Sequence, residues 1–379
     1  MNKPRVLVLG AGFGGLELTT ILSDSLGNQL DITLIDKSDS FAFGFSKLDI
    51  MFGRTTPGAV RIYYRNIVKP GVTFRQEEIT RVDPEARSVV TNAGTYDYDI
   101  LVVALGADYD VDATPGLAEA DEFYTFAGAE RLSKKLPTFT KGSVVIGVAS
   151  WPYKCPPAPS EAALMMHDYL ATRGVRENCQ ITIVSPMSSP IPPSPETSRA
   201  LLSAFAERGI TFMASRTVKE LDNSRGVAML DDGTEIPFDL YLGVPKHRAP
   251  DVVEASGMAE NGWIPVNPAT LTTRYPNVYA IGDVASIGIP KAGVFAEGAA
   301  RVVAESIIAQ VKGGEGPAPF AGAAACYIEF GDGRVGKVEV DFLSGATTKA
   351  AYTEASAALV EDKKRFGSSR RARWFGIPE

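Results

Sequence analysis

Apolar residues of this chain gather in short continuous runs that alternate with stretches of helical periodicity. Runs of this length, without polar alternation, are typical of strands buried on both faces of a parallel sheet. They cover residues 5–9, 31–36, 99–105, 143–148, 180–185 and 275–281. Residues 16–26 and 160–172 place apolar side chains at helical spacing between strands. The alternation predicts an α/β fold built from two Rossmann-like units.

A glycine-rich turn links the first strand to the first helix. Gly10 would permit the tight turn, Gly12 would let the backbone approach a pyrophosphate, and Gly15 would let the helix pack on the strand. The next strand ends at Asp36, 21 residues after Gly15 and followed by Lys37, at the position of a carboxylate that holds a ribose. The loop residues expected to bind a dinucleotide are Gly10, Gly12, Phe13, Gly14 and Gly15.

Two later strands end in turns of the same kind. One delivers Ala104 and Gly106, and the other delivers Gly282 and Asp283. With the first glycine loop, these motifs resemble the flavoproteins with two dinucleotide-binding domains, the glutathione-reductase-like family. The resemblance implies FAD as cofactor, with Asp283 on its ribityl chain. It also implies a helix opening near Val294 whose N-terminus faces the flavin.

The resemblance divides the chain into three parts. A discontinuous FAD-binding domain would comprise residues 1–109 and 246–320. A second domain, related to NAD-binding domains, would comprise residues 110–245. A small C-terminal region would comprise residues 321–379.

The second domain lacks its own glycine loop. After the strand at 143–148 the turn reads Val-Ala-Ser-Trp-Pro-Tyr-Lys-Cys, and a loop with five prolines follows the strand at 180–185. Trp151 and Tyr153 would fill the space that a pyrophosphate needs, which disfavours NADH. Cys155 stands in this turn instead, although a degenerate turn without function would look the same.

The run from Lys154 to Glu161 resembles sulfide:quinone oxidoreductases and the flavoprotein subunit of flavocytochrome c sulfide dehydrogenase. That likeness implies a redox disulfide between Cys155 and Cys326, the latter before a C-terminal strand, with Glu161 moving protons. It also implies that Lys291 neutralises charge at the flavin and that His247 shapes the site. A first-turn glutamate on a helix dipole and an exposed lysine are the plainer alternatives. Many relatives have a third cysteine upstream of position 155, which this chain lacks.

The implied activity is an FAD-dependent oxidation of sulfide, or of a related thiol or persulfide, with electrons passed to a quinone. Three alternatives stay open: an electron-transferring subunit that serves a cytochrome, a type II NADH dehydrogenase, and a flavoprotein with another thiol substrate. A homodimer is an open alternative to a monomer.

Composition narrows the location and the partners. The chain has 379 residues with 38 basic and 45 acidic side chains, a net charge of −7 that argues against nucleic-acid binding. Two histidines without ligand spacing argue against a metal site, and three cysteines are too few for a disulfide framework. No apolar run spans a bilayer, so we expect a cytoplasmic protein. Helical residues 352–360 and six basic residues between 363 and 373, interleaved with Phe366, Trp374 and Phe375, suggest a peripheral contact with the inner face of the cell membrane.

Overall fold

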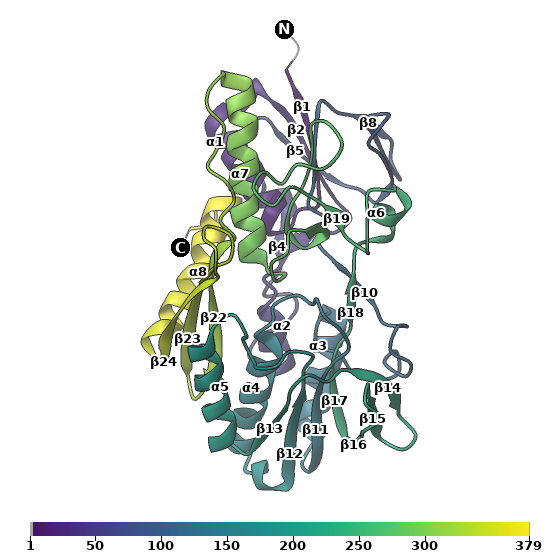
Figure 1. Ribbon diagram of the computed structural model, residues 1–379, viewed down its shortest axis with the longest axis vertical. Coiled ribbons are helices and arrows are strands. Elements are labelled where there is room, and N and C mark those ends of the chain that lie inside the picture. The colour runs from purple at the N-terminus through teal and green to yellow at the C-terminus, as the bar shows by residue number, and fades with distance from the viewer. Residues whose placement is uncertain (1–2, 379) are drawn as a thin grey trace.

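A computed structural model describes residues 3–378 of the chain. Its upper half in Figure 1 is built on a five-stranded sheet of order β20-β9-β1-β2-β5, in which all neighbours pair in parallel. The strands are β1 (Arg5–Leu9), β2 (Asp31–Asp36), β5 (Val72–Gln76), β9 (Ile100–Val103) and β20 (Val278–Ala280). Helices α1 (Phe13–Leu26) and α7 (Gly293–Lys312) pack against each other beside this sheet. β1, β9 and β20 are almost wholly buried, as continuous apolar runs predict.

Shorter elements complete this half. Between β5 and β9 in the sequence, three strands form a separate antiparallel sheet. The elements are β3 (Ser40–Phe41), β4 (Ile62–Tyr63), β6 (Ile79–Asp83), β7 (Ser88–Thr91), β8 (Thr95–Asp97), α6 (Asp251–Ala255), β19 (Ile264–Pro265) and β21 (Ala285–Ser286).

The lower half repeats the design with a four-stranded parallel sheet of order β13-β12-β11-β17. Its strands are β11 (Gly142–Val148), β12 (Cys179–Val184), β13 (Ile210–Met213) and β17 (Leu240–Val244). Its helices are α3 (Phe126–Lys135), α4 (Ala158–Thr172) and α5 (Pro195–Glu207). An antiparallel sheet again precedes the last parallel strand, with β14 (Val218–Asp222), β15 (Val227–Leu230) and β16 (Glu235–Pro237). The two parallel sheets with their helices confirm the predicted α/β class.

The chain passes between the two halves twice, and the two passages lie side by side. β10 (Asp108–Asp110) leads into the lower half, and β18 (Lys246–Arg248) returns antiparallel to it. Helix α2 (Ser46–Met51) comes from the first part of the sequence, yet its apolar side chains belong to the core cluster of the lower half. α2 packs against α3 and so ties the two halves together.

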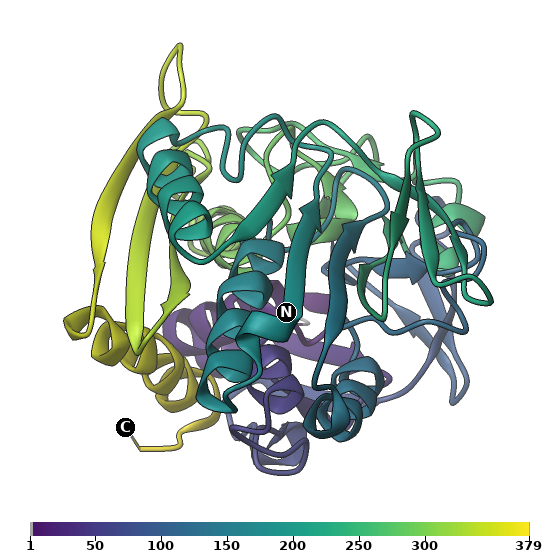
Figure 2. The same cartoon turned by 90° about the horizontal axis from the view of Figure 1, so that it is seen from below.

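The C-terminal region adds a sheet of three antiparallel strands and a long helix. They are β22 (Ala323–Gly331), β23 (Arg334–Asp341), β24 (Lys349–Ser356) and α8 (Ala358–Phe375). β22 packs on α4 and β24 on α5, and Figure 2 shows this yellow-green sheet beside a teal helix of the other half. Two expectations are wrong here: residues 352–356 form a strand rather than a helix, and Cys326 lies within β22 rather than before a strand. Ladder pairing with β23 overrides the helical preference of residues 352–356, and it extends β22 back to include Cys326.

The last turn of α8 is buried in the core of the upper half. Trp374 has no exposed surface, and its indole Nε1 donates a hydrogen bond of 2.8 Å to Glu17 Oε2 on α1. Arg373 pairs with the same carboxylate and Phe375 is nearly buried. The expectation that Trp374 and Phe375 form a surface for lipid is therefore wrong, because a buried acid and the core hold them. Across residues 3–378 the structure has no helix with the length and apolarity needed to cross a membrane.

Candidate active site

The loop from Gly10 to Gly15 brings β1 and α1 too close together for a side chain. A Cβ on Gly15 would lie 1.9 Å from the Gly10 carbonyl oxygen, and one on Gly10, at φ +98°, would lie 2.4 Å from that of Ala104. At Gly12 nothing lies within 4 Å of a Cβ, so the backbone there faces open space. α1 begins directly after it without a side-chain cap, which leaves its first N–H groups free. This cradle fits the pyrophosphate of FAD.

Asp36 lies beside this loop at the end of β2. Its carboxylate accepts hydrogen bonds of 2.8 Å from the backbone N–H groups of Ala11 and Ser38. These bonds fix a carboxylate where the ribose of a dinucleotide would lie next to the pyrophosphate cradle. Lys37 is exposed on the same edge.

A cavity of about 310 Å³ begins where the upper sheet ends. Asp283, after β20, and Val294, in the first turn of α7, both line it. Burial raises the pKa of Asp283, which the charges of Lys154 and Lys291 partly oppose. Gly106 and Gly282 both have positive φ, at the ends of β9 and β20. The strand ends therefore leave room and polar groups for the ribityl chain and ring of a flavin.

Lys291 is buried just before the start of α7, and its ammonium group is bonded to other groups of the protein. Its Nζ donates hydrogen bonds to the carbonyl oxygens of Asp283 and Ala285, and it lies 3.5 Å from the centre of the Trp263 ring. Burial lowers the pKa of Lys291 to about 8. The alternative of an exposed lysine is thus wrong, while its action on a flavin stays a prediction.

Cys155 and Cys326 line the same cavity, and both also line a second one. Cys155 sits in the loop before α4 with φ +54°, a left-handed conformation that non-glycine residues seldom adopt. Its N–H donates a 2.8 Å hydrogen bond to the Lys291 carbonyl oxygen. Cys326 lies on β22, opposite Val338. All three cysteines of the chain are free thiols, and Cys179 is buried away from these cavities.

Both thiols are protonated at neutral pH. Cys155 is open to solvent through the cavities, yet desolvation by the surrounding protein and the charge of Glu161 raise the pKa of its thiol far above the ordinary value. Burial and Glu161 raise the pKa of Cys326 to about 12. A thiol is a poor nucleophile until it loses its proton, so chemistry at this pair needs a base.

Glu161 provides a base of suitable strength. It lies in the first turn of α4 with 3% of its surface exposed, and its Oε1 accepts a 3.0 Å hydrogen bond from the Glu329 N–H. Burial raises the pKa of Glu161 to about 7, although Lys363, with its Nζ 4.0 Å from Oε1, lowers it. A carboxyl group that is half ionised near neutral pH can both take and release protons.

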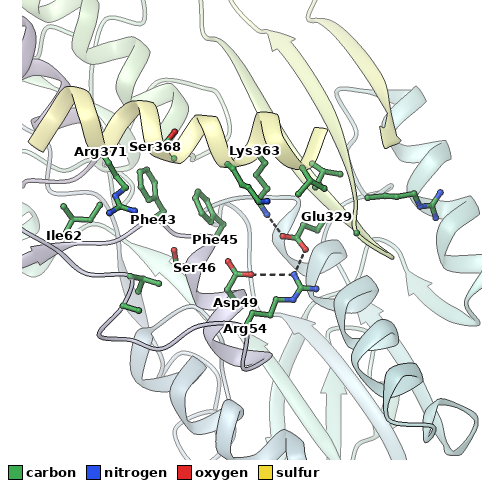
Figure 3. A pocket seen from close by; sticks show the side chains of 18 residues that line it. Phe43, Phe45, Ser46, Asp49, Arg54, Ile62, Glu329, Lys363, Ser368 and Arg371 are labelled. Atoms are coloured by element: carbon green, nitrogen blue, oxygen red, sulfur yellow. Dashed lines mark hydrogen bonds and ion pairs between the residues drawn. The ribbon is translucent and has the colours of Figure 1, made fainter. Parts of the chain in front are cut away.

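A cluster of charged side chains connects Glu161 to a third cavity of about 590 Å³, which lies between α2, α8 and β22 (Figure 3). Lys363 pairs with Glu329 at 2.6 Å, and Glu329 pairs with Arg54 at 2.7 Å. Arg54 also lies 3.7 Å from Asp49. Figure 3 shows these four side chains pointing toward one another below α8. Lys363 lines both this cavity and the one that holds the cysteines.

Several residues of the site escaped the sequence analysis. Lys154 donates to the Ala107 carbonyl oxygen at 2.8 Å and lies 4.4 Å from the centre of the Tyr109 ring. Lys363 was counted only as part of a basic tail. His247, in contrast, was named as a residue that shapes the site; it is buried against Tyr109 and Tyr124, and burial lowers its pKa to about 3, so it is neutral. Spacing in the sequence gives no signal for such contacts, because each joins segments far apart in the chain.

The turn that replaces the second glycine loop offers little to a phosphate. Trp151 is 48% exposed at its surface, whereas Tyr153 is wholly buried, so only Trp151 occupies space in front of the turn. The expectation that both rings fill this space is wrong for Tyr153. Pro157 and Pro159 flank Ala158 at the start of α4 and carry no N–H, and the N–H of Ala158 is bonded to Cys155. The helix start therefore lacks the donors that a pyrophosphate site uses.

Comparison with known proteins agrees with this geometry. A family model described as pyridine nucleotide-disulphide oxidoreductase matches residues 4–301. The chain belongs to this family. It is 27% identical to the sulfide-quinone reductase of Aquifex aeolicus over 356 residues, 86% of this chain and 81% of that one. It is 23% identical to the mitochondrial sulfide:quinone oxidoreductase of Mus musculus over 365 residues, 90% of this chain and 79% of that one.

One solved structure and one further relative agree with this assignment. The sulfide:quinone oxidoreductase from Aquifex aeolicus superposes with a TM-score of 0.87 at 25% identity, covering 98% of this chain and 92% of that one. A type II NADH:quinone oxidoreductase of Staphylococcus aureus is also a homologue, 26% identical over 312 residues and 74% of each chain. The predicted resemblance, the fold and the cofactor FAD are confirmed, and the chain is an FAD-dependent oxidoreductase related to the sulfide:quinone oxidoreductases.

Proposed function

We propose that this pyridine nucleotide-disulphide oxidoreductase oxidises sulfide, or a related thiol or persulfide, at Cys155 and Cys326 and passes the electrons through FAD to a quinone. One observation carries the proposal: two free cysteines and a buried carboxyl of near-neutral pKa line one cavity with the residues of the flavin site. The names of the Aquifex and mouse relatives support the donor and the acceptor.

The pair would begin the reaction as a disulfide. Sulfide adds to one sulfur, the S–S bond breaks, and the products are a cysteine persulfide and a cysteine thiol. A second sulfide then takes the outer sulfur as hydrogen persulfide and leaves two thiols. Restoring the disulfide removes two electrons and two protons. FAD, when bound, supplies the capacity to accept the two electrons and to hand them on.

Glu161 would manage the protons of this cycle. Because the pKa values of both thiols are raised, the Glu161 carboxylate takes each proton before a sulfur reacts. Its hydrogen bond to the Glu329 N–H fixes the carboxylate toward the cavity wall formed by β22.

An aromatic group in the same cavity suits a quinone ring. Phe366 lies with its ring centre 5.9 Å from that of Tyr327 and 6.5 Å from that of Phe45, and all three line the cavity. Flat apolar walls favour a planar apolar acceptor. Contact with a membrane, where quinones dissolve, would then use the surface around α8 rather than its buried end.

The test is anaerobic mixing of the FAD-loaded protein with sulfide and, separately, with NADH. We expect sulfide to bleach the flavin absorbance and decylubiquinone to restore it without another protein. Bleaching by NADH but not by sulfide would overturn the proposal in favour of the type II NADH dehydrogenase that the Staphylococcus relative represents. Bleaching by sulfide that only a cytochrome reverses would identify an electron-transferring subunit.

A further inference from the structure

The larger of the two cavities at the cysteines is far too big and too apolar for sulfide alone. It measures about 820 Å³, within the range of about 300–1,000 Å³ found for pockets that hold drug-sized ligands. It lies in front of the proline-rich turn, and Cys155 and Cys326 form part of its wall. We call it the apolar chamber. The smaller cavity, which is lined by the flavin-site residues, shares only the two cysteines and Ala292 with the apolar chamber.

The walls of the apolar chamber carry almost no charge. They include Trp151, Trp263, Phe295 and Phe342, and seven prolines. Among the residues that the structure describes, no Asp, Glu, Arg or His lines it, and Lys291 is its one ionised side chain. The ammonium of Lys291 is already held by two carbonyl oxygens and the Trp263 ring. A ligand with carboxylates or phosphates would lose water there without gaining a partner.

We propose that the apolar chamber binds an uncharged organic thiol with an apolar body, which accepts the sulfur that the cysteine pair takes from sulfide. The inference rests on the proposed function, since it needs a cysteine persulfide. Burial of an apolar body supplies binding free energy of about 25 cal/mol per Å² of apolar surface, and the two cysteines fix which end of the ligand reacts.

The transfer balances without a further oxidant. The thiol sulfur attacks the outer sulfur of the cysteine persulfide, and the bond between the two persulfide sulfurs breaks. The proton of the thiol passes to the cysteine sulfur that leaves. The products are the cysteine thiol and the persulfide of the organic thiol. Glu161, beside both cysteines, can carry this proton from the organic thiol to the cysteine sulfur that leaves.

The first test measures binding without turnover, in the FAD-loaded protein. Benzyl methyl sulfide serves as an unreactive apolar probe, and S-methylglutathione as its charged counterpart. Trp151 and Trp263 line the chamber while Trp374, the third tryptophan, is buried in the other core. We expect saturable quenching of tryptophan fluorescence by the apolar probe, with at least about tenfold weaker binding of the charged one.

A variant places a charge in the apolar chamber. Ser286 lines it and is exposed, so Ser286→Asp adds a carboxylate without filling the core. We expect this variant to bind benzyl methyl sulfide at least about fivefold more weakly. Ser203→Asp, on the exposed face of α5, is the matched control and should bind like the parent protein. Unchanged binding in Ser286→Asp would place the probe elsewhere and overturn the inference.

The second test measures sulfur transfer during sulfide oxidation with decylubiquinone. The persulfide product is alkylated for detection. We expect benzyl mercaptan to yield its persulfide with kcat/KM at least about tenfold above that of glutathione. Equal binding of the two probes, or preference for glutathione, would overturn the inference even if sulfide bleaches the flavin. Binding of the apolar probe without any bleaching by sulfide would instead overturn the proposed function and leave the chamber as a site.

Discussion

Replacing Lys363 and replacing Glu329 should shift the pKa of Glu161 in opposite directions. Lys363→Met removes a positive charge 4.0 Å from the Glu161 carboxylate. Glu329→Gln removes a negative charge, and it also frees Lys363, whose Nζ is bonded to Glu329 at 2.6 Å. The other ionisable groups near Glu161 are Cys155, Cys326 and Asp49; both substitutions leave these side chains in place, although removing Lys363 also raises the pKa of Cys155 and of Asp49.

The size of the shift follows from the geometry. Two unit charges 4 Å apart interact by about 4 kcal/mol at an effective dielectric constant of about 20, which equals roughly three pKa units as an upper bound. Because Lys363 divides its charge between two carboxylates, we expect the pKa of Glu161 to rise by about one to two units in Lys363→Met. Starting from about 7, the ionised fraction at neutral pH would fall roughly 5- to 50-fold. In Glu329→Gln we expect a fall of up to about one unit.

The assay is the rate of anaerobic flavin reduction by sulfide, followed in a rapid-mixing spectrophotometer from about pH 5.5 to about pH 9. The ratio of variant to parent rates removes the ionisation of sulfide itself. Glu361→Gln is the matched control, since Glu361 lies on the same helix but is exposed and pairs with Lys364. The midpoint should move to higher pH in Lys363→Met, to lower pH in Glu329→Gln and not at all in the control. Shifts of the same sign in both variants, or none, would refute the reasoning.

Three further predictions concern the cofactor, the tail and the nicotinamide site. Gly15→Ala should give a protein without flavin absorbance, because its Cβ would lie 1.9 Å from the Gly10 carbonyl oxygen, whereas Gly94→Ala, in open space, should keep FAD; a yellow Gly15→Ala protein would contradict this. Trp374→Ala should lower the free energy of unfolding in urea by about 3–5 kcal/mol, and Trp151→Ala, half exposed, by much less; equal losses would speak against a structural tail. Because the turn around Trp151 lacks phosphate donors, isothermal titration with NADH should show no micromolar binding; such binding would contradict the account of Pro157 and Pro159.

The sequence predicted those parts of the site that depend on local geometry. The glycine loop, the carboxylate of Asp36 and the cysteine turn are each set within a few residues, by turn chemistry and by strand ends. Glu161 followed from the same short segment, since the helix begins three residues after Cys155. The two parallel sheets followed from continuous apolar runs.

What the sequence did not predict depends on contacts between distant segments. The run Lys363 to Phe375 has the composition of a surface helix, and only the position of Glu17 on α1 explains why Trp374 is buried. Residues 352–356 favour a helix by composition, but the free edge of β23 pairs with them. Glu329 gave no signal because its partners, Arg54 and Lys363, lie 275 and 34 residues away.

The central claim is that Cys155 and Cys326 together oxidise the sulfur substrate. The most direct test is the rate at which sulfide reduces the bound FAD in three single variants, Cys155→Ser, Cys326→Ser and Cys179→Ser. Cys179 is buried in β12 outside both cavities and serves as the matched control. The account predicts that the first two variants bind FAD but lose sulfide-dependent reduction by at least about a thousandfold, while Cys179→Ser reacts like the parent. Reduction at the parental rate in Cys155→Ser or Cys326→Ser would contradict it.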